Sequence, residues 1–137
     1  MGLFGRRKKT VSTAPEEWRE IRWEISSPLM VQFSDGIGSI RAFGRFSCEI
    51  ADAALLAENG CDAHSSDSLK QFSNYLRDLV VRSFKNELGA VSGSMTGNTL
   101  LGNSELLSRA AMDGASPVLA QKGVSLAGLT VDELLKA

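Results

Sequence analysis

The sequence of 137 residues is poor in the residue types that usually build catalytic and metal centres. It contains one histidine and two cysteines, and neither cysteine belongs to a CxxC motif. The histidine, His64, lies in a polar segment without a second histidine or an acidic motif beside it. Because no nucleophile, base or metal ligands occur at a recognisable spacing, we predict a protein that is not an enzyme and has no cofactor or metal.

Long apolar runs and a disulfide pattern are also lacking. The longest apolar run is Ala53–Ala57, whereas a helix that spans a bilayer needs about 20 apolar residues. No apolar stretch follows the basic N-terminal cluster, so it does not read as a signal peptide. Cys48 and Cys61 are too few for a disulfide framework. We therefore expect a cytoplasmic protein with at most peripheral contact at the inner face of the plasma membrane.

The small net charge of −1 conceals a basic N-terminus on an acidic body. Residues 6–9 form a basic cluster of four cations. The rest of the chain has eleven basic and sixteen acidic residues, which argues against binding to nucleic acid. We predict that residues 1–15 form a flexible arm that contacts anionic lipid. The open alternative is a tail that only increases solubility. The predicted membrane-contact residues are Leu3, Phe4, Arg6, Arg7, Lys8 and Lys9.

Two-residue alternation is the clearest structural signal. Between residues 38 and 51, one set of alternate positions is wholly apolar, and the other is polar except for Phe43. Side chains alternate across a strand, so this pattern predicts a half-buried strand. Residues 21–25 and 29–33 show similar alternation and are separated by Pro28, which favours three consecutive antiparallel strands.

Helical spacing follows after residue 52. Apolar residues three and four positions apart predict a long amphipathic helix over 67–88, and Asp52 and Gly60 bound a shorter one. Residues 89–104 are rich in glycine and predict a flexible loop. A further helix over 104–123 should be kinked or split by Pro117, before a short strand at 124–126 and a helical tail.

Together these elements predict one α+β domain over residues 16–137. We expect an antiparallel sheet of three to four strands, with one face packed by the long amphipathic helix and a second C-terminal helix. The polar side of the strand at 38–51 carries Arg41, Phe43 and Arg45. Aromatic residues and arginine are enriched at interfaces, so we predict a self-association surface here, the alternative being an ordinary exposed face.

The order of motifs resembles the SPFH, or band 7, domain, and most closely its bacterial subgroup described as virion core protein-like. The segments "RAFGRF" and "LAQKGVSLAGLTVDEL" resemble a central strand and the closing strand of that domain. The residues that match the family's motifs are Trp23, Pro28, Met30, Gln32, Asp35, Arg41, Ala42, Phe43, Gly44, Phe46, Ile50 and Asp52.

The resemblance implies a non-catalytic, membrane-associated scaffold that self-assembles and organises membrane or partner proteins. The implied partners are the protein itself, an anionic membrane surface and membrane-stress proteins, with no nucleic acid and no small-molecule substrate. Relatives usually carry a further N-terminal β-subdomain, so we expect a shortened or degenerate member. A soluble protein–protein interaction module without a membrane role remains the alternative.

Overall fold

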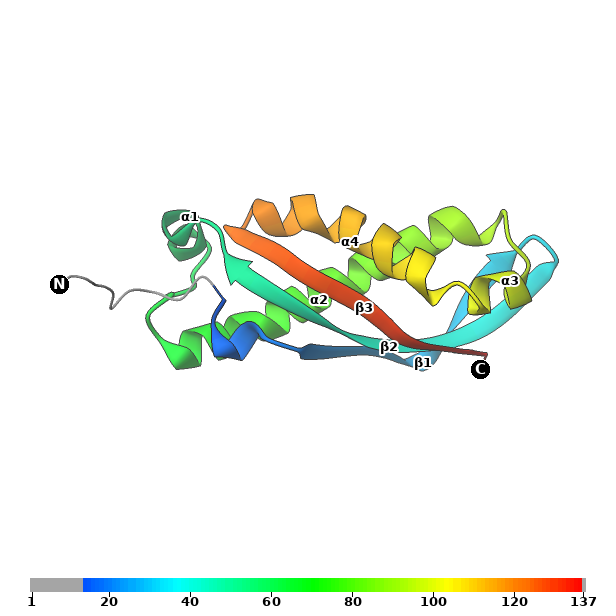
Figure 1. The fold of residues 1–137 in the computed structure, drawn as a ribbon, viewed down its shortest axis with the longest axis horizontal. Coiled ribbons are helices and arrows are strands. Elements are labelled where there is room, and N and C mark those ends of the chain that lie inside the picture. Colours follow the sequence, from blue (N-terminus) through cyan, green and yellow to red (C-terminus); the bar gives the residue numbers. More distant parts are fainter. Residues whose placement is uncertain (1–13, 137) are drawn as a thin grey trace.

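The computed structural model describes residues 14–136, in which helices pack on one side of an antiparallel sheet (Figure 1). The predicted membrane-contact residues lie outside the described residues, so the lipid-binding arm stays a prediction. In chain order the elements are a 3-10 turn η1 (Glu16–Trp18), β1 (Ile21–Phe33), β2 (Gly36–Ile50), α1 (Ala53–Glu58), α2 (Ser66–Ser92), α3 (Gly97–Leu101), α4 (Ser104–Ala120) and β3 (Val124–Lys136).

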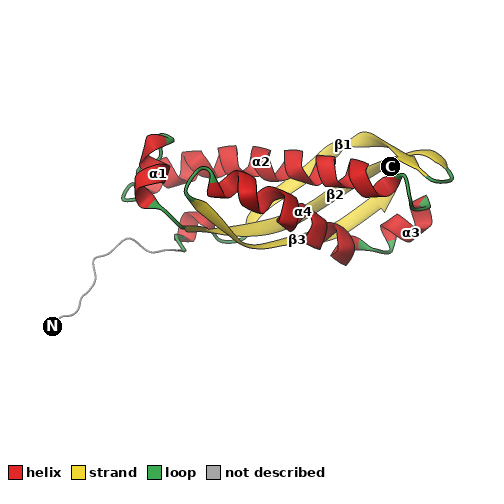
Figure 2. Cartoon of the chain, turned by 90° about the horizontal axis from the view of Figure 1, so that it is seen from above, coloured by secondary structure: helices red, strands yellow, loops and turns green. Residues whose placement is uncertain are grey.

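The described sheet has the order β1-β2-β3, and both neighbours of the central strand β2 are antiparallel to it. Figure 2 shows α2 and α4 on the same side of this sheet. Helix α2 packs against β1 and α4, and α4 packs against β3. The predicted α+β class is therefore confirmed, as is the packing of a long helix and a second C-terminal helix on one face.

The alternation in β2 separates a buried face from an exposed one, as predicted. Its apolar positions, including Ala42, Phe46 and Cys48, are buried beneath the helices. Helix α2 is longer than predicted but begins where expected, because the Ser65 side chain accepts a hydrogen bond from the Ser68 N–H. All six apolar residues of the predicted stripe are buried: Leu69, Phe72, Leu76, Leu79, Val80 and Phe84.

The prediction of two separate strands before residue 34 is wrong, because β1 is one strand with a bulge. Ile25 pairs with Ala42 and Leu29 pairs with Ile40, so three residues of β1 lie opposite Arg41 alone. Pro28 lies in this bulge, and the sheet tolerates it because β1 is an edge strand.

The predicted helical tail is also wrong, because the segment forms most of the thirteen-residue strand β3. Leu129, Val131 and Leu134 are buried along this strand. Their burial beside β2 outweighs the local helix preference of the sequence "DELLK". Bulges at Ala127 and Asp132 keep the apolar side chains of β3 directed toward the core.

Residues 89–104 are not a continuous flexible loop. Helix α2 runs on to Ser92, and α3 occupies residues 97–101. Helix α4 continues through Pro117 to Ala120, so it is not split there. Pro117 is exposed and lies in the last turn of α4, so the missing backbone donor removes little of the helix's hydrogen bonding.

Two glycines have opposite surroundings. A Cβ atom added to Gly44 in β2 would lie 1.9 Å from the Thr130 carbonyl oxygen and 2.9 Å from the ring of Trp23. Gly89 lies inside α2, and a Cβ atom added there would meet no atom within 4 Å. Gly44 is therefore required for the close approach of β2 and β3, whereas Gly89 is not required by the packing of the described chain.

We predict that Gly44→Ala lowers the free energy of unfolding by about 3 kcal/mol, because backbone and ring atoms must shift. Gly89→Ala should raise it by about 0.5–1 kcal/mol, since alanine restricts the unfolded chain and favours the helix. Urea unfolding followed by circular dichroism measures both values. Equal effects of the two substitutions would contradict the packing around Gly44.

Candidate functional site: the open face of the sheet

The sheet face opposite the helices carries exposed side chains from all three strands. We call it the open face. Arg41, Phe43 and Arg45 of β2 all lie exposed on it. Glu24 of β1 and Glu133 of β3 are the direct cross-strand neighbours of Phe43. The structure thus brings the three predicted contact residues together on one exposed strand face, and their role in self-association stays a prediction.

Arg45 anchors a network of ion pairs on this face. Its Nε donates to Asp132 Oδ2 at 2.8 Å, and its Nη1 donates to Glu20 Oε1 at 2.7 Å. A second hydrogen bond, from Nη2 to Asp132 Oδ1, makes the pair with Asp132 bidentate. The hydrogen bond from Arg45 is the main reason that the pKa of Asp132 is lowered. Arg45 is therefore neutralised locally by carboxylates from two other segments.

Three other charged side chains lie around Phe43 and are unpaired within the described residues. Arg41, Glu24 and Glu133 form no ion pair with any residue between 14 and 136. They are exposed and carry both signs of charge within one patch. Mixed charges around an aromatic side chain are typical of a protein–protein contact surface.

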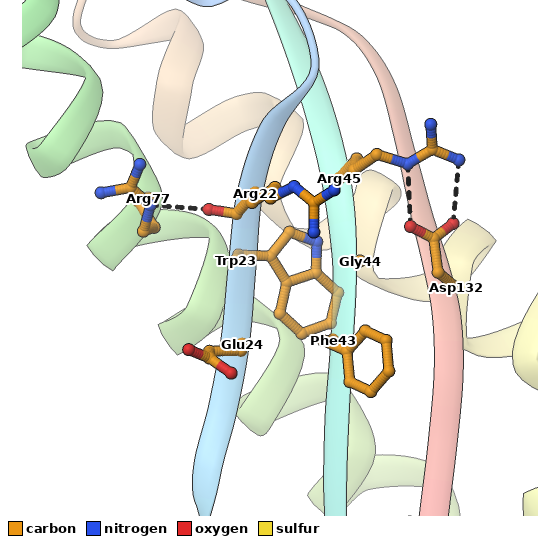
Figure 3. Close-up of a pocket in the computed structure, with 8 residues that line it drawn as sticks. All are labelled: Arg22, Trp23, Glu24, Phe43, Gly44, Arg45, Arg77 and Asp132. Carbon is orange, nitrogen blue, oxygen red and sulfur yellow. Dashed lines mark hydrogen bonds and ion pairs between the residues drawn. The ribbon is translucent and has the colours of Figure 1, made fainter.

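A hollow of about 770 Å³ lies at the β1 side of the open face (Figure 3). Its lining includes Arg22, Glu24, Phe43 and Arg45, and Arg77 approaches from α2. The Nε of Arg77 donates to the Arg22 carbonyl at 2.7 Å and so ties α2 to the outer edge of β1. The hollow offers charged groups for recognition, but its lining holds no thiol, hydroxyl or imidazole nucleophile.

Three exposed apolar residues extend the open face and were missed by the sequence analysis. Met30, Ile37 and Leu135 are 67%, 69% and 42% exposed, respectively. Met30 lies opposite Ser39, and Leu135 lies opposite Arg41. The alternation within residues 29–33 identifies Met30 as outward-facing. Leu135 could not be assigned to the sheet, because its segment was predicted to be a helical tail.

The groups with reactive potential lie away from this surface. Cys48 is buried on the helix side of β2, and burial raises the pKa of its thiol to about 12. Burial also raises the pKa of Cys61. His64 is exposed near α2, and its backbone N–H donates to Asp62 Oδ1. Between residues 14 and 136, no three His, Cys, Asp or Glu residues are grouped to hold a metal ion.

We predict that neither thiol reacts with iodoacetamide in the folded protein at pH 8 over one hour, and that both react in 6 M guanidinium. Both side chains are buried, at 1% and 2% exposure, which keeps the reagent away from the sulfur atoms. Burial also raises the pKa of both thiols, which disfavours the thiolate that alkylation requires. Intact-protein mass spectrometry counts the adducts. Rapid alkylation of Cys48 in the folded protein would show that the sheet–helix core opens readily.

A family model, the SPFH domain-Band 7 family, matches residues 10–135. The chain belongs to this family, whose members are in general membrane-associated scaffolds without catalytic activity. The narrower subgroup stays a prediction. Comparison with curated proteins gave no match. Within the part of the chain that the structure describes, no helix has both the length and the hydropathy needed to cross a membrane.

Proposed function

We propose that this protein is a non-catalytic scaffold that lies in the cytoplasm, attaches peripherally to the inner membrane surface and acts by self-association through its open face. The observation that supports this most directly is the exposure of Phe43 at the centre of that face. Unpaired charges of both signs surround it, so opposite charges on two copies can meet when Phe43 is buried between them.

The apolar residues on the same face support association further. Met30, Ile37 and Leu135 expose large side chains that the two helices do not cover. Burying one such side chain contributes about 1.5–3 kcal/mol before the costs of association are subtracted. A surface with several such exposed apolar residues therefore favours contact with protein over contact with water.

Self-association also makes the proposed membrane contact effective. Each cation of the arm contributes about 1 kcal/mol near an anionic surface, and Leu3 and Phe4 add a few more by insertion. One arm alone binds weakly after ordering costs are subtracted. Several arms on one assembly raise the overall affinity through effective concentration.

We predict that Phe43→Ser lowers the oligomer mass measured by light scattering and leaves the circular dichroism spectrum unchanged. Phe43 is 38% exposed and contributes little to the core, so the fold should survive. Tyr75→Ser is the matched control, because Tyr75 is 40% exposed on α2, away from the open face. A wild-type protein that is monomeric at all concentrations would refute self-association.

The membrane contact predicts that changing Arg6, Arg7, Lys8 and Lys9 to Ser abolishes co-flotation with vesicles containing phosphatidylserine. The control changes four exposed cations of the body, Lys70, Arg82, Arg109 and Lys136, to Ser and alters net charge equally. This control should still float with the vesicles. Equal loss of flotation in both variants would mean that overall charge, not the arm, governs binding.

A soluble protein–protein interaction module is the second candidate, and the open face favours it as much as the first. Its contact residues belong to the folded body and do not depend on the N-terminal arm. Under this alternative, the wild-type protein does not float with vesicles, and a pull-down yields one dominant partner. Native mass measured with and without anionic vesicles distinguishes the two candidates.

A further inference from the structure

Within residues 14–136, no further strand pairs with the outer edge of β1. β1 is an edge strand, and alternate residues of such a strand direct their N–H and C=O groups away from the sheet. Arg22 does so, since its carbonyl accepts from Arg77, and Ser34 does so, since its N–H donates to the Met95 carbonyl. By this alternation the backbones of Met30 and Gln32 also point outward.

A groove runs between this edge and α2. The hollow beside Met30 and Gln32 shares the lining residues Leu29 and Lys85 with the next hollow along β1, which shares Glu24 with the hollow on the open face. The section beside Met30 and Gln32 has a volume of about 320 Å³, and Leu29 and Met30 contribute apolar surface to it. We call this section, from Leu29 to Gln32 and from Lys85 to Gly93, the β1–α2 groove.

The helix wall of the groove lacks side chains where a further strand would lie. Gly89 and Gly93 line it, and a Cβ atom at either position would meet nothing within 4 Å. Glycine inside a helix is unfavourable, and nothing in the described chain packs closely enough against Gly89 to require it. The free space beside an unpaired strand edge is what an added strand needs, since neighbouring strands lie about 4.8 Å apart.

The charges along the edge indicate which chemistry the groove accepts. Lys85 is the charged residue in the lining of the β1–α2 groove. The neighbouring hollows add three basic residues, Arg22, Arg45 and Arg77, and two acidic ones, Glu24 and Asp132. The body of the protein has more acidic than basic residues, so this strip reverses the local sign. A positive strip on an acidic body favours an acidic partner.

The β3 edge of a second copy fits the groove less well. The N–H of Val131, in β3, already donates to Ser108 Oγ of α4 at 2.8 Å. Pairing through that edge would break this bond, whereas a free peptide carries no such cost. The bulge at residues 26–28 further restricts pairing to a short segment beside Met30 and Gln32.

We propose that the β1–α2 groove binds an extended acidic segment of a partner protein, which adds to the sheet as a short strand beside Met30 and Gln32. Its backbone pairs with those two residues. Its carboxylates face α2 and approach Lys85, and its alternate, apolar side chains lie on the opposite side beside Met30. This site lies at the edge of the sheet and goes beyond the self-association surface on the open face.

Fluorescence anisotropy with the full-length protein tests the proposal. The probe is a labelled hexapeptide of alternating glutamate and valine, and it should bind at least tenfold more tightly than the lysine–valine peptide of equal length. The acidic peptide with N-methyl groups on alternate backbone nitrogens should bind at least tenfold more weakly, because strand pairing requires those donors. Absence of binding, or equal binding of the N-methylated peptide, overturns the proposal.

Two variants with matched controls locate the binding site. Gly89→Gln fills the groove and Lys85→Glu reverses its charge, and each should weaken binding of the acidic peptide at least tenfold. Asn86→Gln and Arg82→Glu make comparable changes at exposed positions of α2 outside the groove lining and should alter affinity less than twofold. Equal losses in Arg82→Glu and Lys85→Glu would show only general charge attraction and overturn the proposal.

Light scattering of the same variants tests whether a second copy of the chain, instead of a partner segment, occupies the groove. Gly89→Gln should leave the oligomer mass unchanged, and Phe43→Ser should leave peptide affinity unchanged. If Gly89→Gln lowers the oligomer mass instead, the groove holds a second copy of the chain and the partner-peptide proposal is wrong.

Discussion

One physical constraint shapes the described molecule: two helices cover a three-stranded sheet from the same side. The apolar side chains on the inner face of all three strands are buried against α2 and α4, as in the pair of Trp23 and Phe84, whose ring centroids are 4.9 Å apart. Gly44 permits the close contact of the central strand with both the Trp23 ring and the backbone of β3. Within residues 14–136, the opposite face and a short part of the β1 edge have no covering layer, and the proposed contact surfaces lie there.

This constraint also separates the groups suited to catalysis from those suited to binding. Both thiols are buried, and burial raises their pKa, which disfavours the reactive thiolate. The open layer holds guanidinium and carboxylate groups together with exposed aromatic and aliphatic side chains. Such groups recognise complementary surfaces, and the arrangement agrees with a family of scaffolds without catalytic activity.

The sequence predicted those features that depend on a local repeat. The two-residue period of β2 and the three-to-four-residue period of α2 each arise within one element, so the buried faces of both could be derived. The helical tail was mispredicted because "DELLK" favours a helix locally, whereas pairing with β2, more than 80 residues away along the chain, determines the strand. The bulge in β1 likewise depends on its register with β2.

In the candidate site, too, residues within one strand could be predicted, whereas contacts between distant segments could not. Arg41, Phe43 and Arg45 were found because they alternate on one strand. Asp132 was not found, since its pairing with Arg45 requires the register of a strand that the sequence did not predict. The β1–α2 groove was missed for a related reason: its walls are about 55 residues apart in the sequence, and only tertiary packing brings them together.

Two features of β1 limit strand pairing at the edge of the sheet. Arg77 occupies the edge beside the charged hollow, and the bulge containing Pro28 interrupts the edge further along. These devices block pairing along the whole strand, which would risk aggregation, and leave only a short section open. A short strand addition gives weak binding for one copy. If copies associate through the open face, their grooves remain available together, so an assembly can hold a partner with repeated acidic segments far more tightly than a single copy can.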